Sequence, residues 1–104
     1  MDRIAMLKQM LAQQPENALF HYTLGKELLN QGQAEEAVGP LKRSIELNPR
    51  YTAAYRELGR ALTEAGHIQE AIAIYQEGIR IGDETGDLQT VKEMRVFLNR
   101  LVKK

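Results

Sequence analysis

Residues 52–85 read TAAYRELGRALTEAGHIQEAIAIYQEGIRIGDET, and the 34 residues before them, 18–51, read ALFHYTLGKELLNQGQAEEAVGPLKRSIELNPRY. Aligned at an offset of 34, the two stretches share seven identical residues. Self-similarity at a period of about 20–50 residues is typical of a solenoid, in which each unit packs on the next. The identical pairs are Leu24/Leu58, Gly25/Gly59, Leu28/Leu62, Gly32/Gly66, Glu36/Glu70, Ala37/Ala71 and Ile45/Ile79.

The same offset extends towards the N-terminus. Lys8 and Pro15 align with Lys42 and Pro49, so residues 1–17 match the second half of a repeat whose first half is missing. A solenoid also needs a terminal element with a polar outer face. We therefore expect the final segment to be a capping helix.

Each repeat is predicted to be a pair of helices. Apolar residues recur every three or four positions, which is helical spacing and not strand alternation. Gly32 and Gly66 fall where glycine commonly follows a helix end, and Pro49 disfavours helical geometry in the residue before it. The pattern predicts an all-α chain of about six helices, at residues 2–13, 18–31, 34–47, 52–65, 68–81 and 87–102.

This period and residue pattern resemble the tetratricopeptide repeat family. The matching residues are Leu24, Gly25, Ala37 and Pro49 in the first repeat and Tyr55, Leu58, Gly59, Ala71 and Tyr75 in the second. Two positions depart from the family pattern, because His21 stands in an aromatic position and Asp83 stands where proline is usual. Without proline, residues 83–86 are expected to form a longer, looser corner than Asn48-Pro49.

The resemblance implies one domain over residues 1–104, a right-handed α-solenoid of antiparallel helix pairs. It divides into a half-repeat (1–17), two repeats (18–51 and 52–85) and a capping helix (86–104). The small residues of the motif are expected where the two helices of a unit cross closely. Its tyrosines are expected to fill space between the units.

Composition argues against most chemical functions. The chain has no cysteine, two histidines in different repeats and 14 basic against 14 acidic residues. We therefore expect no enzyme activity, no metal or other cofactor and no nucleic-acid partner, since nucleic-acid binders usually carry a basic excess. No apolar run is long enough to span a membrane, and residues 1–8 lack a signal-peptide core, so a cytoplasmic protein is expected.

The family resemblance implies a concave groove, lined mainly by the first helix of each repeat, that holds a peptide or a segment of a partner protein. The expected groove residues are Tyr22, Lys26 and Leu29 from the first repeat and Arg56, Arg60 and Thr63 from the second. Leu19, Ala53, Asp87, Thr90 and Met94 are expected beside them. The three cations favour an acidic partner. The alternative is that these cations only cover an exposed face and pair with Glu27, Glu57 or Glu64.

Chaperone-binding members of the family hold a C-terminal carboxylate with a clamp of Lys, Asn, Asn, Lys and Arg. The matching positions here hold Tyr22, Lys26, Glu57, Asp87 and Val91. None agrees and two are acidic, so this role is disfavoured.

A second function remains open beside binding of another protein. The half-repeat lacks the helix that would normally cover it, and Met1, Met6 and Met10 offer adaptable apolar contacts there. The chain is thus expected to be a monomer or a homodimer that forms through the half-repeat or the capping helix.

Overall fold

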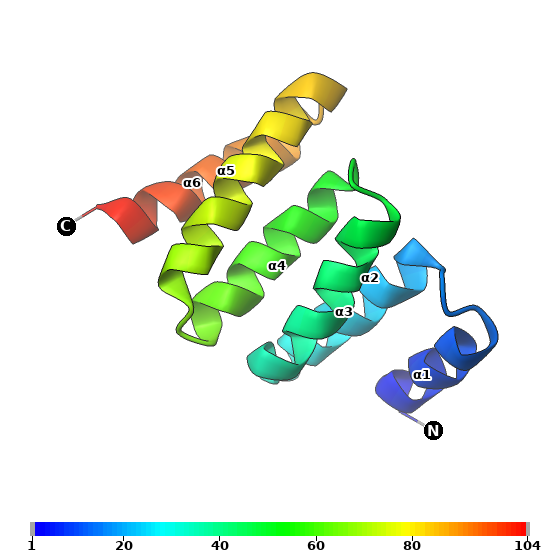
Figure 1. Ribbon diagram of the computed structural model, residues 1–104. Coiled ribbons are helices and arrows are strands. Elements are labelled where there is room, and N and C mark those ends of the chain that lie inside the picture. The colour runs from blue at the N-terminus through cyan, green and yellow to red at the C-terminus, as the bar shows by residue number, and fades with distance from the viewer. Residues whose placement is uncertain (1, 104) are drawn as a thin grey trace.

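The computed structural model describes residues 2–103, which form six α-helices and no strand (Figure 1). The all-α prediction is confirmed, and each predicted helix is present. The helices are α1 (Arg3–Gln13), α2 (Ala18–Asn30), α3 (Ala34–Leu47), α4 (Thr52–Glu64), α5 (Ile68–Thr85) and α6 (Leu88–Val102).

Side-chain caps and glycine turns set where the helices begin and end. The Asp2 carboxylate accepts a hydrogen bond from the Ala5 amide at 2.8 Å, and Asn17 caps α2 in the same way. Gly32 and Gly66 have φ of 79° and 87°. Glycine enters this left-handed region without steric cost, so the chain reverses directly into the second helix of each pair.

The helices lie in two layers. The even-numbered helices contact one another along the stack, α2 with α4 and α4 with α6. In the described chain, α1, α3 and α5 do not contact one another. Stacked helix pairs that curve bring their inner helices together and spread their outer ones. The α2–α4–α6 layer is therefore the inner, concave side. In Figure 1, α2 lies behind α3 and α6 lies behind α5.

The two helices of each repeat cross at a glycine. A Cβ atom on Gly25 would lie 2.4 Å from Cγ of Leu41, and one on Gly59 would lie 2.2 Å from Cε1 of Tyr75. Both distances are far below van der Waals contact, so only glycine allows these helices to approach so closely. Leu41 and Tyr75 fill the space and are themselves buried.

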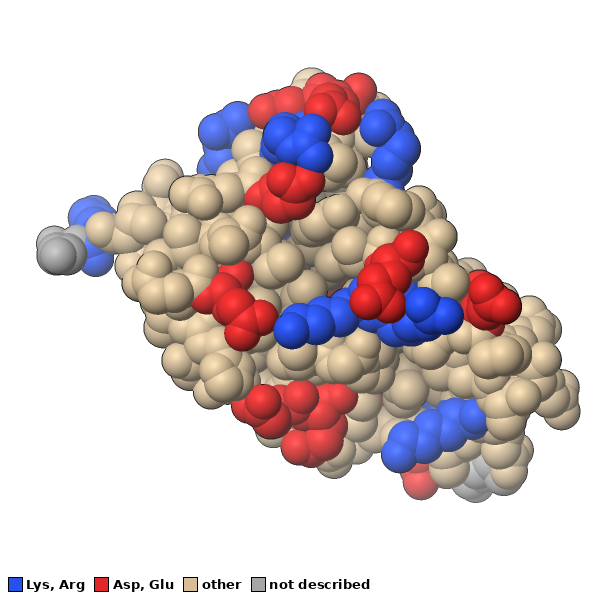
Figure 2. Space-filling view, viewed as in Figure 1, with Lys and Arg blue, Asp and Glu red and all other residues tan. Residues whose placement is uncertain are grey.

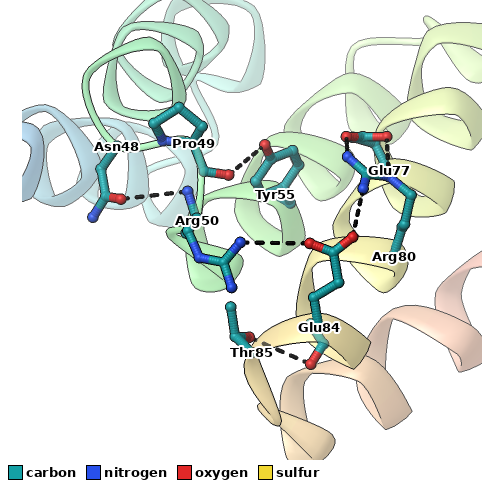
Figure 3. Close-up of polar contacts among 9 residues, drawn as sticks. Asn48, Pro49, Arg50, Tyr55, Glu77, Arg80, Glu84 and Thr85 are labelled. Carbon is teal, nitrogen blue, oxygen red and sulfur yellow. Dashed lines mark hydrogen bonds and ion pairs between the residues drawn. The ribbon is translucent and has the colours of Figure 1, made fainter.

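One hydrogen bond recurs at the start of both repeats. The Tyr55 hydroxyl donates to the Pro49 carbonyl at 2.8 Å (Figure 3), and 34 residues earlier Nε2 of His21 lies 2.8 Å from the Pro15 carbonyl. His21 can therefore replace the tyrosine of this position, because its ring nitrogen donates the same hydrogen bond as the tyrosine hydroxyl. At the same junction Arg50 reaches Glu84 of the next repeat at 3.4 Å (Figure 3).

The prediction of a loose corner at residues 83–86 is wrong. Since Asp83 replaces the expected proline, nothing interrupts α5, and the helix continues to Thr85. It ends at Gly86, which has a φ of 82°, and Asp87 immediately caps α6 by accepting from the Thr90 amide at 3.3 Å. The corner is as tight as the turns inside the repeats.

The longer α5 shifts the register of α6 by two residues. An offset of 36, not 34, aligns the buried residues of α6 with those of α4, so that Thr90 matches Ala54 and Met94 matches Leu58. Thr90 and Met94 are consequently buried, and the prediction that they face the groove is wrong. Asp87 is held at the corner, where it accepts a hydrogen bond from the Thr52 hydroxyl.

This corner predicts a pH dependence. The hydrogen bond from Thr52 lowers the pKa of Asp87 below its ordinary value, with smaller contributions from Thr90. A carboxyl group with a lowered pKa in the folded state stabilises the fold above its unfolded pKa, and the contribution is lost as pH falls through the folded value. Urea unfolding of wild type and Asp87→Asn should differ most at pH 7 and converge below about pH 4. A constant difference from pH 7 to pH 2.5 would contradict this role.

No helix within residues 2–103 has both the length and the apolar character that crossing a bilayer requires.

Candidate functional site

Tyr22 and Lys26, two of the expected groove residues, lie on α2 in the inner layer. The Tyr22 ring packs on Tyr51 with 4.9 Å between ring centroids, and Nζ of Lys26 lies 5.9 Å from the Tyr22 centroid. Within the described residues, Lys26 has no carboxylate at ion-pair distance, and its side chain is exposed. This side chain is therefore available to a partner.

Leu29 does not belong to the accessible face. It is 4% exposed and belongs to the hydrophobic core of the chain. Its spacing of i+7 from Tyr22 and i+3 from Lys26 places Leu29 on the same side of α2, but its apolar side chain packs into the core. The groove prediction is wrong for this residue.

Arg56 and Arg60 surround a buried carboxylate. Glu57 is 2% exposed, and its two oxygens accept from Nε of Arg56 at 2.8 Å and from Nη1 of Arg60 at 3.1 Å. Arg56 also donates to Glu93 of α6 at 2.7 Å. Burial alone would lower the pKa of Arg56, but the bonds to Glu57 and Glu93 outweigh it and raise that pKa above its ordinary value.

The alternative in which groove cations pair with neighbouring glutamates therefore applies to these two arginines. Arg56 is engaged at both ends of its guanidinium and joins α4 to α6. Arg60 is engaged on one side only and its side chain is 40% exposed. The sequence indicated Glu57 only as one of three possible ion-pair partners of the groove cations. Its i,i+3 spacing to Arg60 was the signal that favoured an ion pair between these two residues.

A first pocket adjoins Tyr22 and Lys26. Its volume is about 330 Å³, and Arg3 of α1 contributes to its wall. Arg3 pairs with Glu27 there at 3.4 Å. The remaining lining residues are Thr23 and Asn30.

A second pocket lies between α4 and α6, and we call it the α4–α6 pocket. Its volume is about 190 Å³, and it is lined by Arg60, Thr63, Glu64, Tyr75, Phe97, Arg100 and Leu101. Arg60 and Thr63 are predicted groove residues. The residues from α6 were missed, because a 34-residue offset assigns that helix the wrong face.

On the opposite face of the molecule, exposed basic side chains pair with neighbouring carboxylates. Figure 2 shows basic and acidic side chains intermixed over the outer helices. Lys42 pairs with Glu70 at 3.2 Å, and Arg43 with Glu46 at 3.2 Å. These pairs engage both cations of α3, and α3 and α5 together keep an excess of acidic residues.

The remaining predicted features are dispersed. His67 pairs with Glu35 of the preceding repeat at 3.0 Å, far along the chain from His21. Residues 2–103 contain no group of three or more His, Cys, Asp or Glu side chains suited to a metal ion. Met6 is exposed and Met10 packs against the core, whereas Met1 lies outside the described residues. Self-association through the half-repeat stays a prediction.

Comparison with known proteins gives a consistent result. A family model described as a tetratricopeptide repeat matches residues 22–84. A TPR repeat-containing protein of Pseudomonas aeruginosa is 40% identical over 95 residues, which cover 91% of this chain and 90% of that protein.

Solved structures share the fold. The solution structure of a Bordetella parapertussis protein is 33% identical, with a TM-score of 0.86, covering 99% of this chain and 90% of that one. The TPR2B domain of yeast Sti1, solved as a complex with pHsp70, is 16% identical with a TM-score of 0.88, covering 94% of this chain and 78% of that chain. At this low identity the second likeness concerns the fold alone.

Proposed function

The chain belongs to the tetratricopeptide repeat family, and we propose that it binds a segment of a partner protein along its α2–α4–α6 face. Folds of this family are generally protein–protein interaction modules without catalytic activity. The proposal for this chain is likewise a non-catalytic binding protein that needs no cofactor.

The observation that supports this face is that it presents cations with free donors, whereas the cations of α3 on the outer side are paired. Lys26 has no ion-pair partner in the described chain and Arg60 keeps one side open, whereas both cations of α3, Lys42 and Arg43, pair with carboxylates. Both cations also border pockets. Concave surfaces with aromatic and cationic side chains are typical sites of binding anchors, and these cations favour a partner segment with acidic residues.

The test uses Lys26→Glu, with Lys8→Glu on α1 as a matched control. Both side chains are exposed, and neither has an ion pair in the described chain. The folding free energies should therefore agree within about 0.5 kcal/mol. Affinity capture from a lysate of the source organism, quantified by mass spectrometry, should recover a protein with wild type and Lys8→Glu but not with Lys26→Glu.

Equal recovery by all three proteins would contradict the proposal for this face. Recovery of the chain itself, together with a concentration-dependent mass, would favour the self-assembling alternative.

A further inference from the structure

We propose that the α4–α6 pocket receives one bulky apolar side chain of the partner segment, while Arg60 and Arg100 bind a carboxylate next to it. This inference rests on the proposed function, because it places an anchor point on the same face. The expected ligand is a peptide segment in which a Trp, Phe or Leu adjoins an Asp or Glu.

The apolar half of the pocket is built from two helices, α5 and α6. Tyr75 of α5 is 1% exposed, and its ring centroid lies 5.9 Å from that of Phe97 on α6. Leu101 adds an aliphatic wall one helical turn further along. A cavity of about 150 Å³ with an apolar lining holds a benzene molecule, so the pocket's volume of about 190 Å³ accommodates one large side chain.

The Tyr75 phenol at the pocket is neutral near pH 7, as tyrosine ordinarily is. Desolvation raises the pKa of this phenol to about 12. The hydroxyl therefore adds no negative charge that would repel an acidic ligand.

The rim carries two guanidinium groups against one carboxylate, that of Glu64. Arg100 has no ion-pair partner in residues 2–103, and its Cζ atom lies 6.0 Å from the Phe97 ring centroid. Arg60 commits only Nη1 to Glu57. Each guanidinium presents five N–H donors in a fixed plane, so both arginines retain donors for an incoming carboxylate.

The apolar and charged halves support each other. A side chain seated over Phe97 and Leu101 excludes water beside Arg100, and a charge-assisted hydrogen bond is stronger in the less polar surroundings. The pocket also shares Arg60 and Thr63 with the binding face proposed above. This continuity favours an extended peptide over a free small carboxylic acid.

The experiment is selection of a phage-displayed random dodecapeptide library on the full chain. Arg100→Gln and Leu101→Gln each remove one half of the pocket chemistry. Lys92→Gln is the matched control, since it removes the same charge from an exposed position of the same helix. Peptides selected by wild type and by Lys92→Gln should carry the apolar–acidic pair, and the Arg100→Gln selection should lose the acidic residue.

The affinities of the selected peptides then measure how much the apolar half and the charged half of the pocket contribute to binding. The chain contains no tryptophan, so the fluorescence of a tryptophan-bearing peptide reports binding directly. Arg100→Gln should weaken binding about tenfold or more, as expected for a lost hydrogen bond to a charged group. Changing the peptide's acid to its amide should weaken binding to wild type by a similar factor, and to Arg100→Gln hardly at all.

Several outcomes would overturn the inference. They are selection of no peptide, selection of peptides without the apolar–acidic pair, and equal affinity for wild type and Arg100→Gln. Binding of N-acetyltryptophan as tight as that of the peptides would assign the pocket to a small acid. In each case a loss of partner capture by Lys26→Glu alone would leave the proposed function intact.

Discussion

Replacing Gly59 with leucine should be among the most damaging single changes in this protein. The first added atom, Cβ, already lies 2.2 Å from Tyr75, whose side chain is fully enclosed and cannot retreat. Overpacking of this kind costs about 3 kcal/mol at the upper end of its usual range. For a chain of this length the melting temperature should fall by about 15 °C.

Thermal unfolding followed by circular dichroism measures this effect. Ala73→Leu is a suitable control, because it enlarges an exposed side chain on α5 and leaves the helix crossing untouched. Its melting temperature should stay close to that of wild type. An unchanged melting temperature for Gly59→Leu would contradict the close crossing of α4 and α5.

The double charge reversal Arg56→Glu/Arg60→Glu should destabilise the fold and not merely weaken partner binding. The structure places the carboxylate of Glu57 between the two arginines at 2% exposure. Removing the partners of a buried charge typically costs about 3–5 kcal/mol. The variant is therefore unsuitable as a test of binding.

Urea unfolding of the double variant and of a triple variant that adds Glu57→Gln checks this explanation. The triple variant should recover part of the lost stability, because it no longer buries an uncompensated charge. Reversal of Lys42 and Arg43, whose ion pairs are exposed, should cost less than about 1 kcal/mol per pair. If both double reversals lowered the free energy of unfolding by the same small amount, the stabilisation of buried Glu57 by its arginines would be contradicted.

The repeat frame could be predicted from the sequence because its signals are local or strictly periodic. Gly25 and Gly59 mark the helix crossings, and the structure confirms the reason, since neither position has room for a side chain. Glycine and proline likewise marked the ends of most helices. These residues act through backbone geometry, which a single sequence displays directly.

The rest depended on geometry between elements. The continuation of α5 to Thr85 shifts α6 by two residues, and this shift decides that Met94 is buried and that Arg100 borders a pocket. Whether Arg56 is free or forms a second ion pair depends on the position of Glu93 on α6, across the helix interface. No sequence period contains that information.

The hydrogen bond between His21 and Pro15 fixes the tautomer of that imidazole. A carbonyl oxygen can only accept, so the ring proton resides on Nε2, which faces Pro15 at 2.8 Å. Nδ1 of the neutral ring is then left as an acceptor. The histidine that replaces an aromatic residue in the first repeat therefore makes the same donation to a proline carbonyl that Tyr55 makes in the second.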